Sequence, residues 1–159
     1  MRVSRFPLTL ALLVAACEAA PPPPPPPPYW PVADVKELMA AVLEPAADVY
    51  WDAVGTIDDK SGSKEIRPSN AQEWETVRRS ALVVAEAGNL LMMPTRARDD
   101  GEWMTFSRAM IDAATRAVAA AAAKNATAVF DAGAEVYDTC TRCHATYAVE
   151  QIRPNAEKP

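Results

Sequence analysis

Residues 140–144 read C-T-R-C-H, a C-x-x-C-H pattern close to the C-terminal end of the sequence. This spacing is typical of covalent attachment of a c-type haem. Two thiols add across the two vinyl groups of the porphyrin, and the imidazole that follows ligates the iron. On a helix, Cys140 and His144 lie four residues apart on one face, so one helix can supply both attachments and one ligand. The pattern therefore predicts one covalently bound haem c held by Cys140, Cys143 and His144.

Three other interpretations of this pattern agree less well with the rest of the chain. A thioredoxin-like C-x-x-C lies in a strand–turn–helix context, whereas the surrounding sequence predicts continuous helix. A structural zinc site needs four ligands, but the chain contains only one other cysteine, Cys17, and no other histidine. Two buried thiols beside a core histidine would carry no function. That interpretation leaves unexplained why the only histidine directly follows the only C-x-x-C.

Length and composition predict a single domain that is mainly helical. The chain has 159 residues, five glycines and a net charge of −5, and its high alanine content favours helix over sheet. This excess of acidic residues is unlike the clustered positive charge of proteins that bind nucleic acid. It suits a basic redox partner without identifying one. No nucleophile–base pair accompanies the motif, so we do not predict an enzyme.

The first 16 residues are expected to be a signal peptide. Residues 1–5 carry two arginines, and residues 6–16 form an apolar run too short to span a bilayer. The run ends V-A-A-C, which resembles the bacterial lipobox, so Cys17 is expected to be lipidated and to anchor the protein to a membrane. Cleavage near Ala19 or Ala20, which would discard Cys17, is the alternative. Export to the periplasm agrees with the haem motif, because c-type haem is attached after export.

Eight consecutive prolines occupy residues 21–28. Such a run adopts polyproline II and would act as a stiff spacer of about 25 Å. A PxxP ligand for a recognition domain is the alternative. The expected organisation is therefore a signal peptide at 1–16, lipidated Cys17 with a polyproline linker at 17–30, a haem-binding bundle at 31–154 and a tail at 155–159.

Four amphipathic helices are predicted between residues 31 and 154. The first begins at a capping box that starts with Asp34, is interrupted by Pro45 and stops near Gly55. Residues 58–68 are polar and contain glycine, which predicts a loop. The next helices are expected at 69–93, from about 102 through the alanines of 119–123, and from a cap at Asn125 to before Pro154. Short connections then predict an all-α, antiparallel up-down-up-down four-helix bundle. The predicted apolar face of the first helix comprises Val35, Leu38, Met39, Val42, Ala46, Val49 and Ala53.

A C-x-x-C-H on the last helix of such a bundle resembles the class II cytochromes c, which comprise the cytochromes c-prime and their low-spin, methionine-ligated relatives. Class I cytochromes carry the motif near the N-terminus of the domain and a ligand methionine after it, but no methionine follows Cys143 here. The resemblance covers about residues 32–152. It rests on the motif position, on Tyr147 three residues after His144 and on a methionine in the first helix, and it implies a haem-binding fold of the cytochrome c-prime type.

The resemblance further implies that a residue of the first helix faces the sixth position of the iron, and Met39 is the candidate. A thioether ligand opposite histidine gives a six-coordinate electron carrier with a raised potential. An uncoordinated side chain gives a five-coordinate iron that binds small gases such as NO or CO. Met39 as an ordinary core methionine is a third possibility. The competing methionines are Met92, Met93, Met104 and Met110.

Two positions depart from the family pattern. Cytochromes c-prime often carry an arginine four residues before the helix-one position and another after the motif tyrosine, where this chain has Val35 and Ala148. Loss of these cations changes the electrostatics around the haem propionates and argues against the gas-binding branch. Lys36, Arg78 or Arg142 could supply a compensating charge.

Together these features predict a periplasmic, membrane-anchored c-type cytochrome that transfers electrons through iron ligated by His144 and Met39. The alternative is a five-coordinate, gas-binding protein of the cytochrome c-prime type. The expected partners are an unidentified redox protein and, as an open question, a second copy of the chain in a homodimer; nucleic acid is not expected. Four aromatic residues are expected in the core, with stacking on the porphyrin left open: Tyr50, Trp51, Trp74 and Trp103.

Overall fold

The computed structural model describes residues 28–148. The chain divides into two units, residues 1–30 and 31–159, and nearly all the described residues belong to the second. The predicted signal peptide, Cys17, most of the polyproline run, Pro154 and the predicted tail lie outside the described residues.

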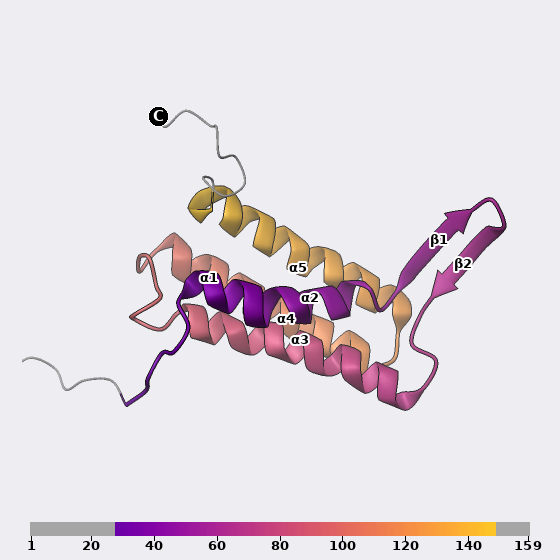
Figure 1. Cartoon of the computed structure of the whole chain (residues 1–159), viewed down its shortest axis with the longest axis horizontal. Helices are drawn as coiled ribbons and strands as arrows, with labels where there is room; N and C mark the ends of the chain where they lie inside the picture. The colour runs from indigo at the N-terminus through magenta and orange to yellow at the C-terminus, as the bar shows by residue number, and fades with distance from the viewer. Residues whose placement is uncertain (1–27, 149–159) are drawn as a thin grey trace, which may run out of the picture. The chain divides into compact units, whose positions relative to one another are not determined.

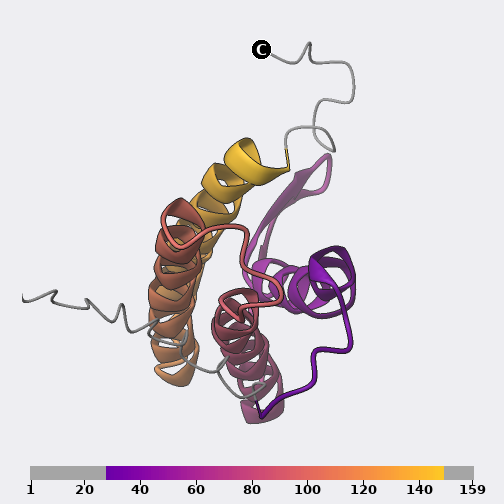
Figure 2. The same ribbon diagram turned by 90° about the vertical axis from the view of Figure 1, so that its left-hand side faces the viewer.

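Residues 31–148 are mostly helical, with four helices and one small hairpin (Figure 1). In chain order the elements are α1 (Val35–Leu38), the π-helical turn η1 (Met39–Leu43), α2 (Glu44–Trp51), β1 (Gly55–Asp59), β2 (Gly62–Ile66), α3 (Ala71–Leu91), α4 (Glu102–Ala122) and α5 (Ala126–Tyr147). The helices α3, α4 and α5 pack against one another in sequence, and the N-terminal helical stretch, made of α1, η1 and α2, packs on α3 (Figure 2). No helix among residues 28–148 combines the length and apolar character needed to cross a bilayer.

Side-chain hydrogen bonds cap the starts of α1 and α3. The carboxylate of Asp34 accepts a 2.8 Å hydrogen bond from the backbone N–H of Glu37, as the predicted capping box requires. The cap of α3 is Asn70, one residue after the start expected for this helix at residue 69. Its side chain accepts from the N–H of Glu73 at 3.0 Å, and the Glu73 carboxylate accepts from the N–H of Ser69 at 2.6 Å. Both ends of this reciprocal arrangement satisfy amides that a helix start otherwise leaves unpaired.

A three-residue connection joins α4 to α5. Lys124 adopts a left-handed conformation (φ 53°), and the N–H of Asn125 donates to the carbonyl of Ala120 at 3.3 Å, which closes the end of α4. The side chain of Asn125 then accepts from the N–H of Ala128 at 3.1 Å, so the predicted cap of the last helix is confirmed. This tight connection sets α5 alongside α4 (Figure 2).

The prediction of a loop at residues 58–68 is wrong, and with it the all-α class is only partly right. The strands β1 and β2 form an antiparallel hairpin in which Asp59 pairs with Gly62 across a two-residue turn. The carboxylate of Asp59 accepts from the N–H of Ser61 at 2.7 Å, and Gly62 takes φ +130°, which a side chain would disfavour. Nearly every residue of the hairpin is exposed, so it lacks the alternation of apolar and polar residues from which a strand is predicted.

The predicted interruption at Pro45 takes the form of the π-helical turn η1. Proline has no N–H to donate to the carbonyl four residues before it. The chain widens ahead of it, so that the N–H of Glu44 donates to the carbonyl of Met39, five residues back. Pro45 then falls in the first turn of α2, where a missing N–H leaves no bond unmade.

The extra residue in this turn shifts the buried face of the following helix, α2, by one position. The sequence predicts Val42, Ala46 and Val49 on the inner face, but Val49 is 43% exposed. The buried positions after the turn are each one residue later than those predicted, because a π turn takes in one residue more than an α turn. These buried positions are Leu43, Ala47, Tyr50 and Val54.

Three hydrogen bonds from two large side chains, Arg96 and Trp103, hold the connection between α3 and α4 in place. The buried side chain of Arg96 donates from Nε to the carbonyl of Ala33 at 3.0 Å and from Nη1 to that of Leu90 at 3.4 Å. The indole of Trp103 donates to the carbonyl of Leu91 at 2.8 Å. Because Ala33 directly precedes the cap of α1, the arginine fixes the start of the N-terminal helical stretch relative to the end of α3.

Close packing of α3 on α4 depends on Gly88. A Cβ at this position would lie 2.4 Å from Cγ1 of Ile111 and 3.1 Å from the carbonyl oxygen of Ser107. We predict that Gly88→Ala lowers the free energy of unfolding by about 1–3 kcal/mol, because the two helices must move apart. The matched control is Gly55→Ala, since nothing lies within 4 Å of a Cβ there. Urea unfolding followed by circular dichroism measures both, and equal stability of the two variants would contradict the packing.

Candidate functional site

The three side chains of the motif line one cleft of about 480 Å³ between the N-terminal helical stretch and α5. This volume lies in the range of about 300–1,000 Å³ typical of pockets for cofactors. Residues from all four helices contribute to a lining that is predominantly apolar. Apart from the motif, the lining includes Met39, Leu43, Ala47, Trp51, Val84, Leu91, Phe106, Met110 and Tyr137.

Helical spacing on α5 explains why the motif faces the cleft. Tyr137, Cys140 and His144 stand at intervals of three and four residues, so they share one face of the helix. The same helix buries Val136, one position round from Tyr137, against the other helices, and Cys140 packs at the edge of that core. The buried stripe therefore turns the motif face toward the N-terminal helical stretch.

Both thiols are free and half-buried. Burial raises the pKa of Cys140 above its usual value. Burial, with a smaller contribution from Cys140, raises the pKa of Cys143 to about 11. A thiol that is neutral at physiological pH is a poor nucleophile for disulfide exchange, so this environment is unlike that of a redox-active C-x-x-C.

His144 is half-buried, and within residues 28–148 no hydrogen bond involves its imidazole. In the same part of the chain, no group of three or more His, Cys, Asp or Glu side chains converges on a point where it could hold one ion. Cys140, Cys143 and His144 thus line one cleft without surrounding one centre. That arrangement suits a large planar group with separate points of attachment better than a single zinc ion.

Two of the five candidate methionines line the cleft. Met39 does so from η1 and Met110 from α4, where it is 6% exposed. Met92, Met93 and Met104 are not among the lining residues, and the sulfur of Met93 accepts from Nη1 of Arg96 at 3.0 Å. The structure therefore reduces the competitors of Met39 to Met110.

Aromatic side chains form part of the lining, and two of them were not singled out from the sequence. Phe106 and Tyr137 line the cleft together with Trp51, whereas Trp74 and Trp103 do not. Tyr137 could have been found from its spacing of three and seven residues to Cys140 and His144. Phe106 gives no comparable signal, because its place depends on how α4 packs. Trp51, expected in the core with stacking on the porphyrin left open, is half-buried, packs against the core and lines the cleft.

One end of the cleft is closed by contact between α2 and α5. The indole of Trp51 donates to the carbonyl of Gly133 at 3.0 Å and meets the ring of Tyr137 edge-on at 5.7 Å. A Cβ at Gly133 would lie 3.2 Å from Cδ1 of Trp51 and 3.4 Å from Cε1 of Tyr50. The glycine therefore lets the two helices approach here, while the motif and Met39 lie farther along the same helices beside open space.

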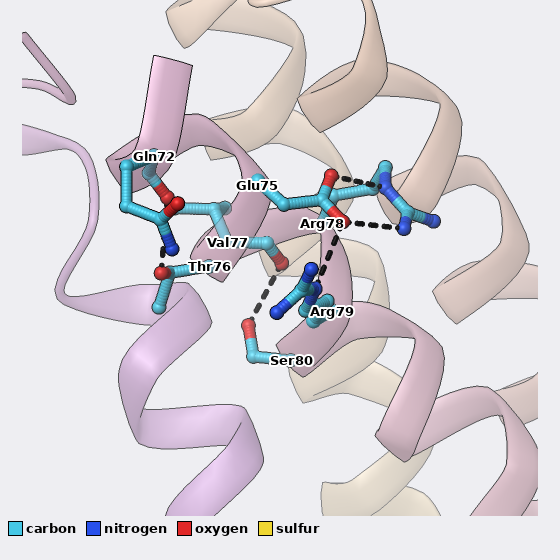
Figure 3. Close-up of polar contacts among 7 residues, drawn as sticks. All are labelled: Gln72, Glu75, Thr76, Val77, Arg78, Arg79 and Ser80. Atoms are coloured by element: carbon cyan, nitrogen blue, oxygen red, sulfur yellow. Dashed lines mark hydrogen bonds and ion pairs between the residues drawn. The ribbon is translucent and has the colours of Figure 1, made fainter. Parts of the chain in front are cut away.

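The three cations considered for the neighbourhood of the cofactor differ in their surroundings. Arg78 pairs with Glu75 at 2.7 Å, and Figure 3 shows the same carboxylate also holding Arg79. Lys36 is exposed on α1. The guanidinium of Arg142 lies 5.9 Å from the centre of the Phe106 ring, which itself lines the cleft. Arg142 thus lies close to a residue of the lining.

The last turn of α5 is held by Tyr147. Its hydroxyl donates to Asp99, whose other carboxylate oxygen accepts from the N–H groups of Gly101 and Trp103 at the start of α4. The Tyr147 ring also meets that of Trp103 edge-on at 5.0 Å. These contacts fasten the helical turn that carries His144 to the connection before α4. No signal in the sequence pairs Asp99 with Tyr147.

Comparison of the chain with protein-family models, with curated proteins and with solved structures finds no match.

The Tyr147–Asp99 hydrogen bond predicts a pH-dependent stability. It lowers the pKa of Asp99 below 3.8, so its contribution is lost as pH falls below that value. It raises the pKa of Tyr147 from 10.0 to about 12, so the contribution is also lost as pH rises through this range. We predict that wild type is more stable than Tyr147→Phe between about pH 4 and pH 10, and that the difference shrinks outside this window. Urea unfolding across pH measures it, and a difference independent of pH would contradict the assignment.

Proposed function

We propose that this protein is a c-type cytochrome that binds one covalent haem and transfers electrons, built as an antiparallel four-helix bundle of the class II type. The observation that carries the proposal is the cleft itself. Two thiols and an imidazole from α5 line the same apolar space as a methionine from the N-terminal helical stretch. The sequence contains no second C-x-x-C-H motif.

The residues of the cleft fit a haem on three grounds. Cys140 and Cys143 are unpaired thiols, as thioether formation requires. The imidazole of His144 makes no competing hydrogen bond within the described residues. The remaining lining is largely aliphatic and aromatic, which suits the faces of a porphyrin. When bound, haem supplies an iron that exchanges one electron between its ferric and ferrous states.

The chain's own residues would hold and tune this group. Cys140 and Cys143 would fix it covalently to α5, and His144 would supply one ligand to the iron. Met39 lies on the part of the cleft contributed by the N-terminal helical stretch, which supports it as the second ligand. The contact of Trp51 with Gly133 limits access of water at one end of the cleft. Ligation by both residues favours electron transfer over gas binding, because no position on the iron is left open.

Export and anchoring belong to the same proposal. Covalent attachment of haem takes place after export, and the N-terminal sequence that ends at Cys17 has the form of a lipoprotein signal. Lipidation of Cys17 would hold the domain at a membrane facing the periplasm.

Covalent haem is tested by expressing the chain with intact export and haem-maturation machinery. We predict a haem-stained band after denaturing electrophoresis, located in the membrane fraction. The double variant Cys140→Ala/Cys143→Ala should lose the band completely, whereas each single variant should keep one thioether and a reduced signal. Cys17→Ser is the matched cysteine control. It should keep the full stain but move to the soluble periplasmic fraction, and a colourless wild-type protein would refute the proposal.

Ligation by Met39 is tested by absorption spectra of the purified haem protein. We expect the wild-type protein to have a low-spin ferric form with a weak far-red band. Met39→Ala should remove this band and lower the reduction potential by on the order of 0.1 V, which is part of the range of about 0.8 V that haem ligands span. Met104→Ala, outside the lining, should change neither. Loss of the band in Met110→Ala but not in Met39→Ala would move the ligand to α4. A high-spin wild-type protein that binds carbon monoxide at once would favour the gas-binding alternative.

A further inference from the structure

A second apolar cavity, of about 400 Å³, lies between the end of α2 and α5. Trp51 and Tyr137 line this cavity and the cleft alike, so the two spaces meet at the edge-on contact of these rings. Phe130, Gly133 and Ala134 contribute the α5 side of the second cavity.

This cavity is bordered by aromatic side chains that the fold leaves exposed. Phe130 is 62% exposed and Tyr137 is 60% exposed. With Ala134 they stand at i, i+4 and i+7 on α5, which places them on one face of the helix. We call Trp51, Phe130, Ala134 and Tyr137 the α2–α5 surface. Trp51 is half-buried, and the other three form a contiguous exposed apolar patch of the kind typical of sites of interaction.

Acidic residues border this surface on α2. Glu44 and Asp48 precede Trp51 by seven and three residues, so they share its face of the helix, and Asp52 follows it directly. All three carboxylates are exposed. Glu44 and Asp48 also line the cleft beside the motif.

Acidic residues border the surface on α5 as well. Asp131 and Asp138 lie three residues before and four residues after Ala134, and both are exposed. The nearest cation on this helix is Arg142, which pairs with Asp138 at 3.6 Å. The α2–α5 surface is therefore an apolar centre with a predominantly negative rim.

We propose that the α2–α5 surface is the docking site for a basic redox protein. A rim of carboxylates attracts a positively charged partner and speeds its encounter, while the apolar centre provides contact once the rims have met. The same rim disfavours a second copy of this chain, because a twofold axis would bring like charges together. The surface borders the cleft through Trp51 and Tyr137, so a partner docked there would lie next to the proposed cofactor. The inference thus rests on the proposed function and names the class of its partner.

The probe for this proposal is a basic class I cytochrome c, used natively and after its lysines have been succinylated, which reverses their charge. Titration calorimetry of the haem-loaded protein against each form measures the affinity at low and at raised salt. We expect binding of the native probe that weakens steeply with salt, and no binding of the succinylated probe.

Paired variants locate the site. Asp52→Asn/Asp131→Asn, on the rim, should weaken binding by about tenfold at low salt, whereas Glu86→Gln/Asp112→Asn, exposed on α3 and α4, should leave it within about twofold. Phe130→Ala should weaken binding by about fivefold. Its apolar control is Leu82→Ala, a side chain 41% exposed on α3.

The outcomes separate this inference from the proposed function. A protein that carries haem but binds both probes equally, or whose rim and control variants lose affinity alike, overturns the docking site alone. Sedimentation showing a dimer that Phe130→Ala dissociates would assign the surface to a second copy and also overturn it. A protein without covalent haem contradicts the proposed function, whatever the titrations show.

Discussion

Proline at position 45 is the constraint on which the arrangement of the cleft depends. Without an N–H at this residue, the N-terminal helical stretch cannot keep a continuous α-helical ladder, and the chain inserts one residue as the π turn Met39–Leu43. The turn shifts the inner face by one position, so that Tyr50 is buried and its hydroxyl donates to the carbonyl of Ala117 at 3.3 Å. Trp51 is thereby brought to α5, while Met39, the first residue of the turn, lines the cleft together with the motif.

The cleft stays open because α5 packs along α4 but approaches the N-terminal helical stretch closely only near Gly133. Near its beginning, Gly133 admits the indole of Trp51 and a hydrogen bond joins the two helices. Near its end, Tyr147 binds Asp99 and packs edge-on against Trp103, which is anchored to Leu91. Between these points the helix presents the motif to space lined by apolar side chains. Half-buried thiols, and an imidazole that makes no hydrogen bond within residues 28–148, suit the tethered planar cofactor that we propose.

The features of the fold that depend on residues close together in the sequence could be predicted from the sequence alone. The caps at Asp34 and Asn125 are short-range hydrogen bonds, and both were located correctly. The motif could be placed on the last helix because its spacing defines a helical face. The inner face after Pro45 was predicted one residue too early, because a regular period of 3.6 cannot include the extra residue of a π turn. The hairpin was missed because Asp59 and Gly62 form its turn without any apolar alternation beside it. Two features could not be predicted, because they depend on packing between segments that are distant in the sequence. They are the place of Phe106 and Met110 in the cleft lining and the hydrogen bond between Tyr147 and Asp99.

The central claim is that one porphyrin is joined to both cysteines of a motif that has an arginine between them. Trypsin cuts after Arg142, and so divides the chain between Cys140 and Cys143. Mass spectrometry of a tryptic digest of the exported protein, after full reduction of disulfides, therefore tests the claim directly. We predict that the fragments ending at Arg142 and beginning at Cys143 remain joined in one species, heavier than their sum by the mass of one haem. Two separate, unmodified fragments would contradict the account.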